Sequence, residues 1–509
     1  MKSGLNLMRM NKKGFAFIAI LLTVSNFLGK ILGFAKDLLI SYYYGATDLT
    51  DALFLALSIP TIILGVFTSS TDSAIIPQYN RLFISKGKLF ADRHFSTILN
   101  SILTLGLFVS VFIVVYPEWF VSLFAPGFSD IQRTYATWFL RLFSFVGFFH
   151  ILYCFLCTYI IRYKNVWIRS VLSFSTNLVV VIALLISPDK HMITLSYAFL
   201  IASIVQGVLP VIGMIKLKYK HIFSFEDFGD LEYKKFWLLF MPIMGAAFLT
   251  NLNFFIDKYL ATNFEEGSVS FLNYSFRITS IFDSIIVVGL GVVILPLLSD
   301  LNINGSKEKF KNVISSTVMR TVAVLTPIAI CVLLYSKEII HVVYFRGKFG
   351  IEPVKNVAEL LFYYAPLILL IPLKSIMSRF FHSLENTKTP LRITIGSVVL
   401  NIVLSVFLSK IMGLKGIALA TSISLLCNIV LNFYYLNKIT GWSLYYFNFV
   451  DITKLISLLV LLTIIFNIFK ELINNSYLII LLVVPLVLLL FYYSLYIIFR
   501  KKYEKLFTK

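Results

Sequence analysis

Charged side chains interrupt the first long apolar stretch of the chain, FLGKILGFAKDLLISYYYGATDLTD (27–51). At 100° per residue along a helix, Asn26, Lys30, Asp37 and Ser41 fall in one narrow sector and form a polar stripe. An ammonium group near the centre of a bilayer costs about 2.5–3.5 kcal/mol even by the lower estimates. The stripe predicts a water-filled cavity for an anionic substrate, with Lys30 in its wall; the alternative is a structural pair of Lys30 with Asp37, or a snorkelling lysine.

Three further ionisable residues join Lys30 and Asp37 as candidates for substrate binding. Lys36 lies near the outer interface, where snorkelling explains it as well as substrate contact does. Asp51 begins the next helix, and the helix dipole favours a carboxylate in the first turn, so a structural role is the stronger alternative there. Arg277, in NYSFRITSIFD (273–283), is permanently charged and suits bidentate contact with phosphate. Its alternative is a bond to an aspartate that fixes helix packing.

A second group of polar residues is predicted to lie either in the same cavity or at helix ends. They are Asn26, Asp257, Lys258, Asp283 and Lys374, and, as weaker candidates, Arg141 and His150. We expect neither a catalytic set nor a metal site, because the six histidines are scattered and the C-x-x-C of Cys154 and Cys157 lies in an apolar run.

The composition is that of a membrane protein. Of 509 residues, 59% are hydrophobic and only 14% are charged, against about 25% charged in soluble chains. The net charge of +20 comes from lysines and arginines in short clusters between apolar segments, which indicates topology signals and attraction to anionic lipid. Nucleic acid is not an expected partner.

The apolar segments predict an all-α polytopic membrane protein with about fourteen transmembrane helices. We place these helices near 14–44, 51–79, 93–116, 134–161, 166–187, 192–216, 233–262, 268–299, 309–335, 355–382, 389–410, 414–437, 450–470 and 476–500.

Basic loops alternate with loops poor in lysine and arginine along this list of helices. By the positive-inside rule both termini are cytoplasmic, and short loops such as GATDLTD (45–51), SPDKH (187–191) and NFEEGS (263–268) face outward. The loop 336–356 is predicted to be outside although it carries several cations.

A weak internal repeat predicts two lobes. The pair of segments at 27–80 resembles 248–300, and a basic turn before a helix with an asparagine recurs at 158–181 and 379–405. Two six-helix units in the same direction imply an axis along the membrane normal and a cavity between the lobes. The expected division is 1–220 for the N-lobe, 221–440 for the C-lobe and 441–509 for two additional helices and a basic tail.

The quoted segments also resemble a known family. GKILGFAKDLLISYYYGATDLTDALFLALSIP (29–60) resembles the opening of the MurJ (MviN) family, the lipid II flippases of the multidrug/oligosaccharidyl-lipid/polysaccharide exporter superfamily. NYSFRITSIFDSIIVVGLGVVILPLLS (273–299) resembles the eighth helix of that family, YFRGKFG (344–350) its outer loop, and RFFHSLENTKTPLRITIGSVVLNIVLS (379–405) the turn between its tenth and eleventh helices.

This resemblance implies a fourteen-helix, V-shaped flippase whose cationic cavity takes the diphosphate-sugar head of a polyprenyl-linked precursor. Family arginines fall on Lys30 and Lys36, the family aspartate on Asp51 and the arginine of the eighth helix on Arg277. Lysine keeps the charge at the first two positions but loses the planar fork of arginine. The family's arginine pair and glutamate in helix 2 have no counterpart in TIILGVFTSSTDS (61–73).

The predicted function is transport of an undecaprenyl-diphosphate glycan, most simply lipid II for peptidoglycan synthesis, across the bacterial cytoplasmic membrane by alternating access. A flippase for capsular or other surface polysaccharide units is the alternative; a cation-coupled drug exporter and a membrane glycosyltransferase fit less well. We expect a monomer without a cofactor, in contact with membrane lipids and cell-wall synthesis proteins, and the sequence leaves the coupling ion or membrane potential open.

Overall fold

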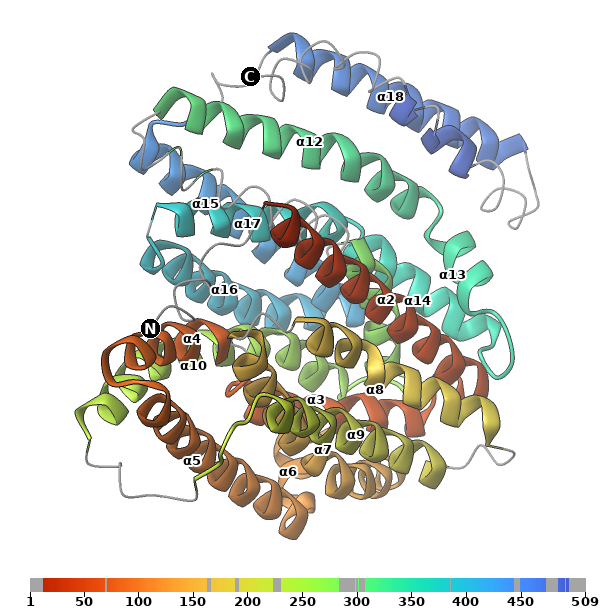
Figure 1. Cartoon of the computed structure of the whole chain (residues 1–509). Coiled ribbons are helices and arrows are strands. Elements are labelled where there is room, and N and C mark those ends of the chain that lie inside the picture. The colour runs from red at the N-terminus through yellow and green to blue at the C-terminus, as the bar shows by residue number, and fades with distance from the viewer. Residues whose placement is uncertain are drawn as a thin grey trace. The chain divides into compact units, whose positions relative to one another are not determined.

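The structure is a computed structural model, and it is helical wherever it describes regular secondary structure (Figure 1). The described residues are 12–68, 71–162, 166–187, 192–222, 230–282, 298, 301, 307–384, 386–443, 449–472, 484–489 and 491–493. Within this part of the chain, nine helices are long and apolar enough to cross a membrane, and a bent pair adds a tenth. The prediction of an all-α membrane protein is confirmed, whereas the total of fourteen helices stays a prediction.

The chain divides into two compact units, residues 1–270 and 271–509. The first contains α2 (Lys12–Tyr44), α3 (Asp48–Gly65), α4 (Thr71–Lys86), α5 (Lys88–Val115), α6 (Pro117–Phe124), α7 (Asp130–Arg162), α8 (Val166–Ile186), α9 (Met192–Lys216) and α10 (Leu231–Ala261). Within it, α7 packs against α3, α5 and α9, and α2 packs mainly on α8. The predicted lobe boundary at 220 rests on the repeat and stays a prediction; here α10 packs on α3 and α4.

The segment predicted as one helix over 51–79 is instead two helices, α3 and α4. The chain leaves α3 after Gly65 in a turn, and two threonine hydroxyls bond back to carbonyl groups there: Thr68 Oγ1 donates to Gly65 O at 2.9 Å, and Thr71 Oγ1 donates to Phe67 O at 3.0 Å. Such hydroxyls compete with the helical bonding pattern of the backbone. Hydropathy does not distinguish one long helix from two shorter ones across such a turn.

The second unit contains α12 (Lys307–Leu334), α13 (Ser336–Tyr344), α14 (Ile351–Tyr364), α15 (Leu367–Ser383), α16 (Lys388–Met412), α17 (Leu414–Thr440) and α18 (Phe449–Leu472). The single helix predicted over 355–382 is the pair α14 and α15, bent by 41°. Pro366 lies at this break, where its missing N–H and its ring disfavour a continuous helix. The predicted loop 336–356 contains the short helix α13.

Glycine allows two of the closest helix contacts. A Cβ atom at Gly207 of α9 would lie 2.8 Å from the carbonyl oxygen of Phe149 in α7, and one at Gly416 of α17 would lie 2.1 Å from that of Leu408 in α16. Without a hydrophobic driving force between helices in lipid, small residues let backbones approach closely enough for dispersion contacts. In Figure 1, α16 and α17 run side by side accordingly.

Candidate functional site

The helix that carries the polar stripe, α2, packs on α8, and its Lys36 reaches α9. Asn177 of α8 donates from Nδ2 to Gly29 O at 3.1 Å, which fixes α2 beside α8 next to Lys30. Lys36 Nζ lies 3.5 Å from Asp37 Oδ1 and 5.1 Å from the centroid of the Phe199 ring. The two charged side chains are only 15% and 5% exposed. Lys36 is therefore held by a carboxylate and an aromatic face.

Lys30 lies on α2 and is half-buried, two turns before Asp37. Asn26 lies in the same helix, but its side chain falls outside the described ones. Asp37 forms an ion pair with Lys36. Whether Lys30 meets a substrate remains a prediction.

Lys258 lies in the last turn of α10, where a cation interacts favourably with the helix dipole, and Asp257 precedes it. Lys258 Nζ donates to Phe54 O of α3 at 3.2 Å, and the Asp37 carboxylate stabilises this ammonium electrostatically. Asp257 is 5% exposed. The structure thus brings Lys36, Asp37 and Lys258, from two segments distant in sequence, into one charged cluster.

Asp51 lies in the first turn of α3 and is 1% exposed. Its carboxylate accepts from Gly267 N at 2.8 Å, Ser270 N at 2.7 Å and Ser270 Oγ at 2.6 Å. Residues 268–282 are helical, so Asp51 satisfies N–H groups that have no partner inside that helix. The structure therefore gives Asp51 a capping role, and its proposed contact with substrate is untested.

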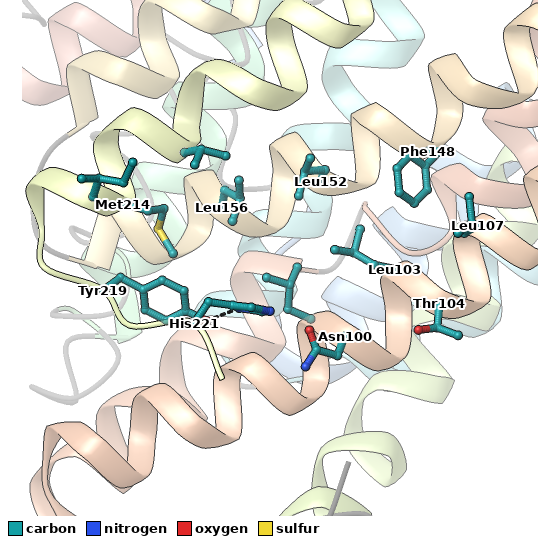
Figure 2. A pocket seen from close by; sticks show the side chains of 13 residues that line it. Asn100, Leu103, Thr104, Leu107, Phe148, Leu152, Leu156, Met214, Tyr219 and His221 are labelled. Atoms are coloured by element: carbon teal, nitrogen blue, oxygen red, sulfur yellow. Dashed lines mark hydrogen bonds between the residues drawn. The ribbon is translucent and has the colours of Figure 1, made fainter. Parts of the chain in front are cut away.

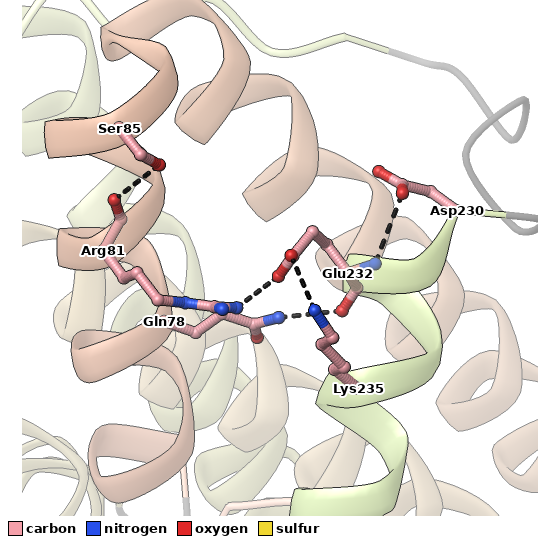
Figure 3. Close-up of polar contacts among 6 residues, drawn as sticks. All are labelled: Gln78, Arg81, Ser85, Asp230, Glu232 and Lys235. Carbon is pink, nitrogen blue, oxygen red and sulfur yellow. Dashed lines mark hydrogen bonds and ion pairs between the residues drawn. The ribbon is translucent and has the colours of Figure 1, made fainter.

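The other end of α10 is joined to α4 by a polar cluster (Figure 3). Glu232 binds Arg81, and Lys235 Nζ donates to Glu232 Oε1 at 3.2 Å. Gln78 Nε2 donates to the Glu232 carbonyl at 2.8 Å, and Asp230 caps the helix. An exposed ion pair contributes roughly 0–1 kcal/mol. These contacts therefore set the position of this end of α10 and add little to the stability of the fold.

A polar cavity of about 450 Å³ lies within the first unit. Its walls come from α3, α7, α8, α9 and α10, and its polar lining residues are Thr61, Thr68, His150, Thr176, Ser203, Gln206 and Asn251. Gln206 Oε1 lies 3.4 Å from His150 Nδ1, and Gln206 Nε2 donates to Leu172 O at 3.1 Å. Since an amide oxygen only accepts, the His150 contact requires the hydrogen on Nδ1. Neutral donors and acceptors of this kind suit hydroxyl and amide groups.

Arg277 belongs to the second unit and is half-buried in the helical residues 268–282. Tyr274, one turn earlier, packs its ring 5.1 Å from Tyr344 and 5.5 Å from Phe349, both in the segment predicted as an outer loop. This aromatic cluster fixes the helix one turn from the guanidinium. Lys374 lies on α15, and Asp283 lies outside the described residues.

Sequence reasoning missed the neutral members of the site. Gln206 and Asn251 are single polar residues within apolar runs, and nothing in their spacing distinguishes a cavity wall from ordinary packing. His150 was a weak candidate, and the structure places it in the cavity. The buried bonds of Asp51 to Gly267 and Ser270 could not be foreseen, because they join residues more than 200 positions apart.

Comparisons with known proteins place the chain in one family. A family model described as "Lipid II flippase MurJ" matches residues 40–488. A probable lipid II flippase MurJ of Thermotoga maritima is 26% identical over 82% of this chain and 84% of its own length, and one of Bdellovibrio bacteriovorus is 24% identical over 81% and 80%.

Solved structures agree on the fold. A lipid II flippase MurJ in an inward closed conformation has a TM-score of 0.81 at 23% identity, covering 95% of this chain and 99% of that one. An inward-facing multidrug resistance MATE transporter has a TM-score of 0.68 at 14% identity, covering 81% and 94%. Since the family model spans most of the chain, this multi-pass membrane protein belongs to the lipid II flippase MurJ family and is a transporter, not an enzyme.

Proposed function

We propose that this chain carries lipid II from the inner to the outer leaflet of the bacterial cytoplasmic membrane by alternating access. Membership of the family favours this cargo over a capsular unit, and the likeness to drug exporters extends to the fold alone. The observation that carries the proposal is the charge pattern of α2, a 33-residue helix that the sequence predicts to cross the membrane: it has two ammonium groups and one carboxylate between residues 27 and 44. A helix with excess positive charge inside the bilayer suits an anionic cargo.

The division of labour follows from the chemistry of the cargo. We assign the diphosphate to the cations, with Lys30 and Arg277 as the principal contacts and Lys36 and Lys258 as supporting charges. The neutral cavity around Gln206 offers hydrogen bonds to the sugar or peptide part. Charged and neutral polar groups of these two kinds suit the two chemical halves of a lipid-linked glycan head.

The test is complementation of a strain depleted of its own lipid II flippase, with cargo flipping and membrane abundance measured side by side. Lys30→Ala should abolish flipping at normal abundance, and Lys30→Arg should largely retain it because the cation survives. Arg277→Lys should flip measurably less, because lysine loses the bidentate contact with phosphate. Lys410→Ala, at an exposed helix end, is the control.

Two results would contradict the proposal. If the wild-type chain reaches the membrane but does not complement, lipid II is not its cargo. If Lys30→Ala complements as well as Lys410→Ala does, the stripe on α2 is structural.

A further inference from the structure

An elongated groove lies between α5, α7 and α9 of the first unit, away from the polar cavity (Figure 2). Its volume is about 420 Å³, and its apolar walls include Leu103, Leu107, Phe148, Leu152, Val211 and Ile215. Leu107 is 45% exposed and Ile215 is 69% exposed, so the groove opens on the surface of spans that face hydrocarbon in a membrane.

The two long walls run parallel over the same length. Figure 2 shows Leu103 and Leu107 of α5 opposite Leu152 and Phe148 of α7. The lining residues extend from Leu99 to Leu107 on α5 and from Leu156 to Phe148 on α7, eight positions each. At 1.5 Å per residue this is about 12 Å, the length of a straight hydrocarbon segment of several methylene groups.

One end of the groove is polar. Asn100, Tyr219 and His221 lie there, and Tyr219 OH is 2.6 Å from Ser96 Oγ and 3.2 Å from His221 Nδ1. The Tyr219 ring packs 4.8 Å from the ring of Tyr159. Burial raises the pKa of the Tyr219 phenol and lowers the pKa of the His221 imidazole, so both groups are neutral at pH 7.

Lysines flank this polar end along the chain. Lys216, Lys218 and Lys220 are exposed in the segment that also carries Tyr219 and His221. Lys88 Nζ donates to Leu217 O at 3.5 Å, which ties the start of α5 to the same segment. The neighbouring carboxylate, Asp92, is 5% exposed and accepts from Tyr79 and Tyr159, so it faces the core.

We propose that this groove binds an anionic phospholipid, with one acyl chain along α5 and α7 and the phosphate beside Lys216, Lys218 and Lys220. The apolar wall and the basic end lie in the order in which a phospholipid presents its chain and head group. Basic pockets between membrane helices bind anionic head groups in this way. A zwitterionic phospholipid presents the same phosphate, but its own ammonium group offsets the attraction to the lysines. A polyprenyl chain, with a methyl branch on each unit, is thicker than a straight acyl chain.

Native mass spectrometry tests the site without reference to transport. The full chain, purified in mild detergent and stripped of lipid, is titrated with phosphatidylglycerol or phosphatidylcholine of the same acyl chains. We expect one tightly held phosphatidylglycerol and no such phosphatidylcholine. Lys218→Gln with Lys220→Gln should weaken this binding about 25-fold, since each lysine near an anionic surface contributes about a factor of five.

Groove filling separates the acyl contact from the charge. Leu103→Trp should remove the tightly held lipid, whereas Leu105→Trp, on a different face of α5, should retain it. Equal retention of both phospholipids would overturn the charge assignment. Unchanged binding in Leu103→Trp, with a native melting temperature, would show that the lipid binds outside the groove. Replacement of the bound lipid by undecaprenyl phosphate at equimolar concentration would show that the groove prefers a polyprenyl chain, which would overturn the proposal.

Discussion

The buried charge of Asp51 is stabilised differently from that of Lys36 and Lys258. Asp51 accepts hydrogen bonds from Gly267 and Ser270, so donors within the protein take the place of water around its carboxylate. Lys36 and Lys258 both interact with the Asp37 carboxylate, so two ammonium groups lie near one carboxylate there. A carboxylate whose hydrogen bonds are all made within the protein stabilises the fold, whereas ammonium groups near a single carboxylate can also bind an anionic ligand.

We expect Asp51 to contribute to stability before it contributes to transport. A hydrogen bond to a charged group is worth about 1.5–3 kcal/mol, and a truncated partner leaves buried donors unsatisfied. Asp51→Ala should therefore lower the melting temperature and the membrane abundance markedly, and Asp51→Asn should do so to a smaller extent. Thermal unfolding in detergent and quantified membrane abundance provide the measurements.

Asp48→Asn is the matched control, because Asp48 lies in the same turn of α3 and is half-buried. It should change the melting temperature little. Normal stability of Asp51→Asn together with lost flipping would assign Asp51 to the cargo instead.

At this scale the sequence identifies charged residues and misses neutral ones. Lys30, Lys36, Asp37 and Lys258 are conspicuous because charge is costly in a bilayer, wherever it points. Asn251 carries no such signal, since a single amide in an apolar run is compatible with any packing. The partners of the charged residues come from distant segments, so only the folded chain reveals them.

Among the elements, α16 and α17 form the tightest described pair in the second unit. Asn401 Nδ2 donates to Thr421 Oγ1 at 3.2 Å, and Asn428 Nδ2 donates to Ser397 Oγ at 2.8 Å. In membrane proteins such interhelical bonds contribute about 0.6 kcal/mol each on average. Their main effect here is to fix the register of two helices that Gly416 allows to touch.

Gly416→Ala should disrupt this pair, because its Cβ would lie 2.1 Å from Leu408 O, well inside van der Waals contact. We expect a large loss of membrane abundance and of melting temperature. Gly396→Ala, on α16, is the control, since nothing lies within 4 Å of the added carbon. It should be neutral or stabilising by about 0.4–1 kcal/mol. Equal stability of the two variants would show that α16 and α17 are further apart than described.

Helix bounds were predictable where an apolar run is bounded by polar residues on both sides. The expected span 192–216 coincides with α9, and 166–187 differs from α8 by one residue. The prediction failed at 51–79, where the chain turns after Gly65, and it missed α13, whose nine residues are too few to span a membrane. Hydropathy alone does not detect a break between two apolar helices, which accounts for the first error.

On the scale of the whole molecule, each unit has its own hydrophobic core. Phe95, Phe155 and Phe236 contribute to one in the first unit, and Phe380 and Trp442 contribute to one in the second. The core of the first unit includes Phe236 of α10, which explains why this helix packs there. A sequence repeat reflects how the chain arose, whereas a hydrophobic core reflects the contacts in the folded protein. The lobe boundary predicted at 220 and the boundary between the compact units at 270 therefore need not agree.

The orientation of the whole chain is testable by labelling. With the four native cysteines replaced, single cysteines at Ser85 and Glu265 report the two sides. By the positive-inside rule, Glu265→Cys should react with an impermeant maleimide in intact spheroplasts, and Ser85→Cys should react only in inverted vesicles. Both side chains are exposed, so access is not limited by packing. The reverse pattern would contradict cytoplasmic termini.

The hydrogen bonds of Asp51 to Gly267 and Ser270 also have a consequence for biogenesis, because the donors are synthesised long after the acceptor. Its hydroxyl donor, Ser270, follows it by 219 residues. At about 5–20 residues per second, a ribosome needs about 10–45 s to reach it. During that interval the nascent α3 carries an ionised group whose native donors do not yet exist. The insertion machinery must therefore keep this end of α3 hydrated, at the membrane surface or beside an insertase, until Gly267 and Ser270 emerge.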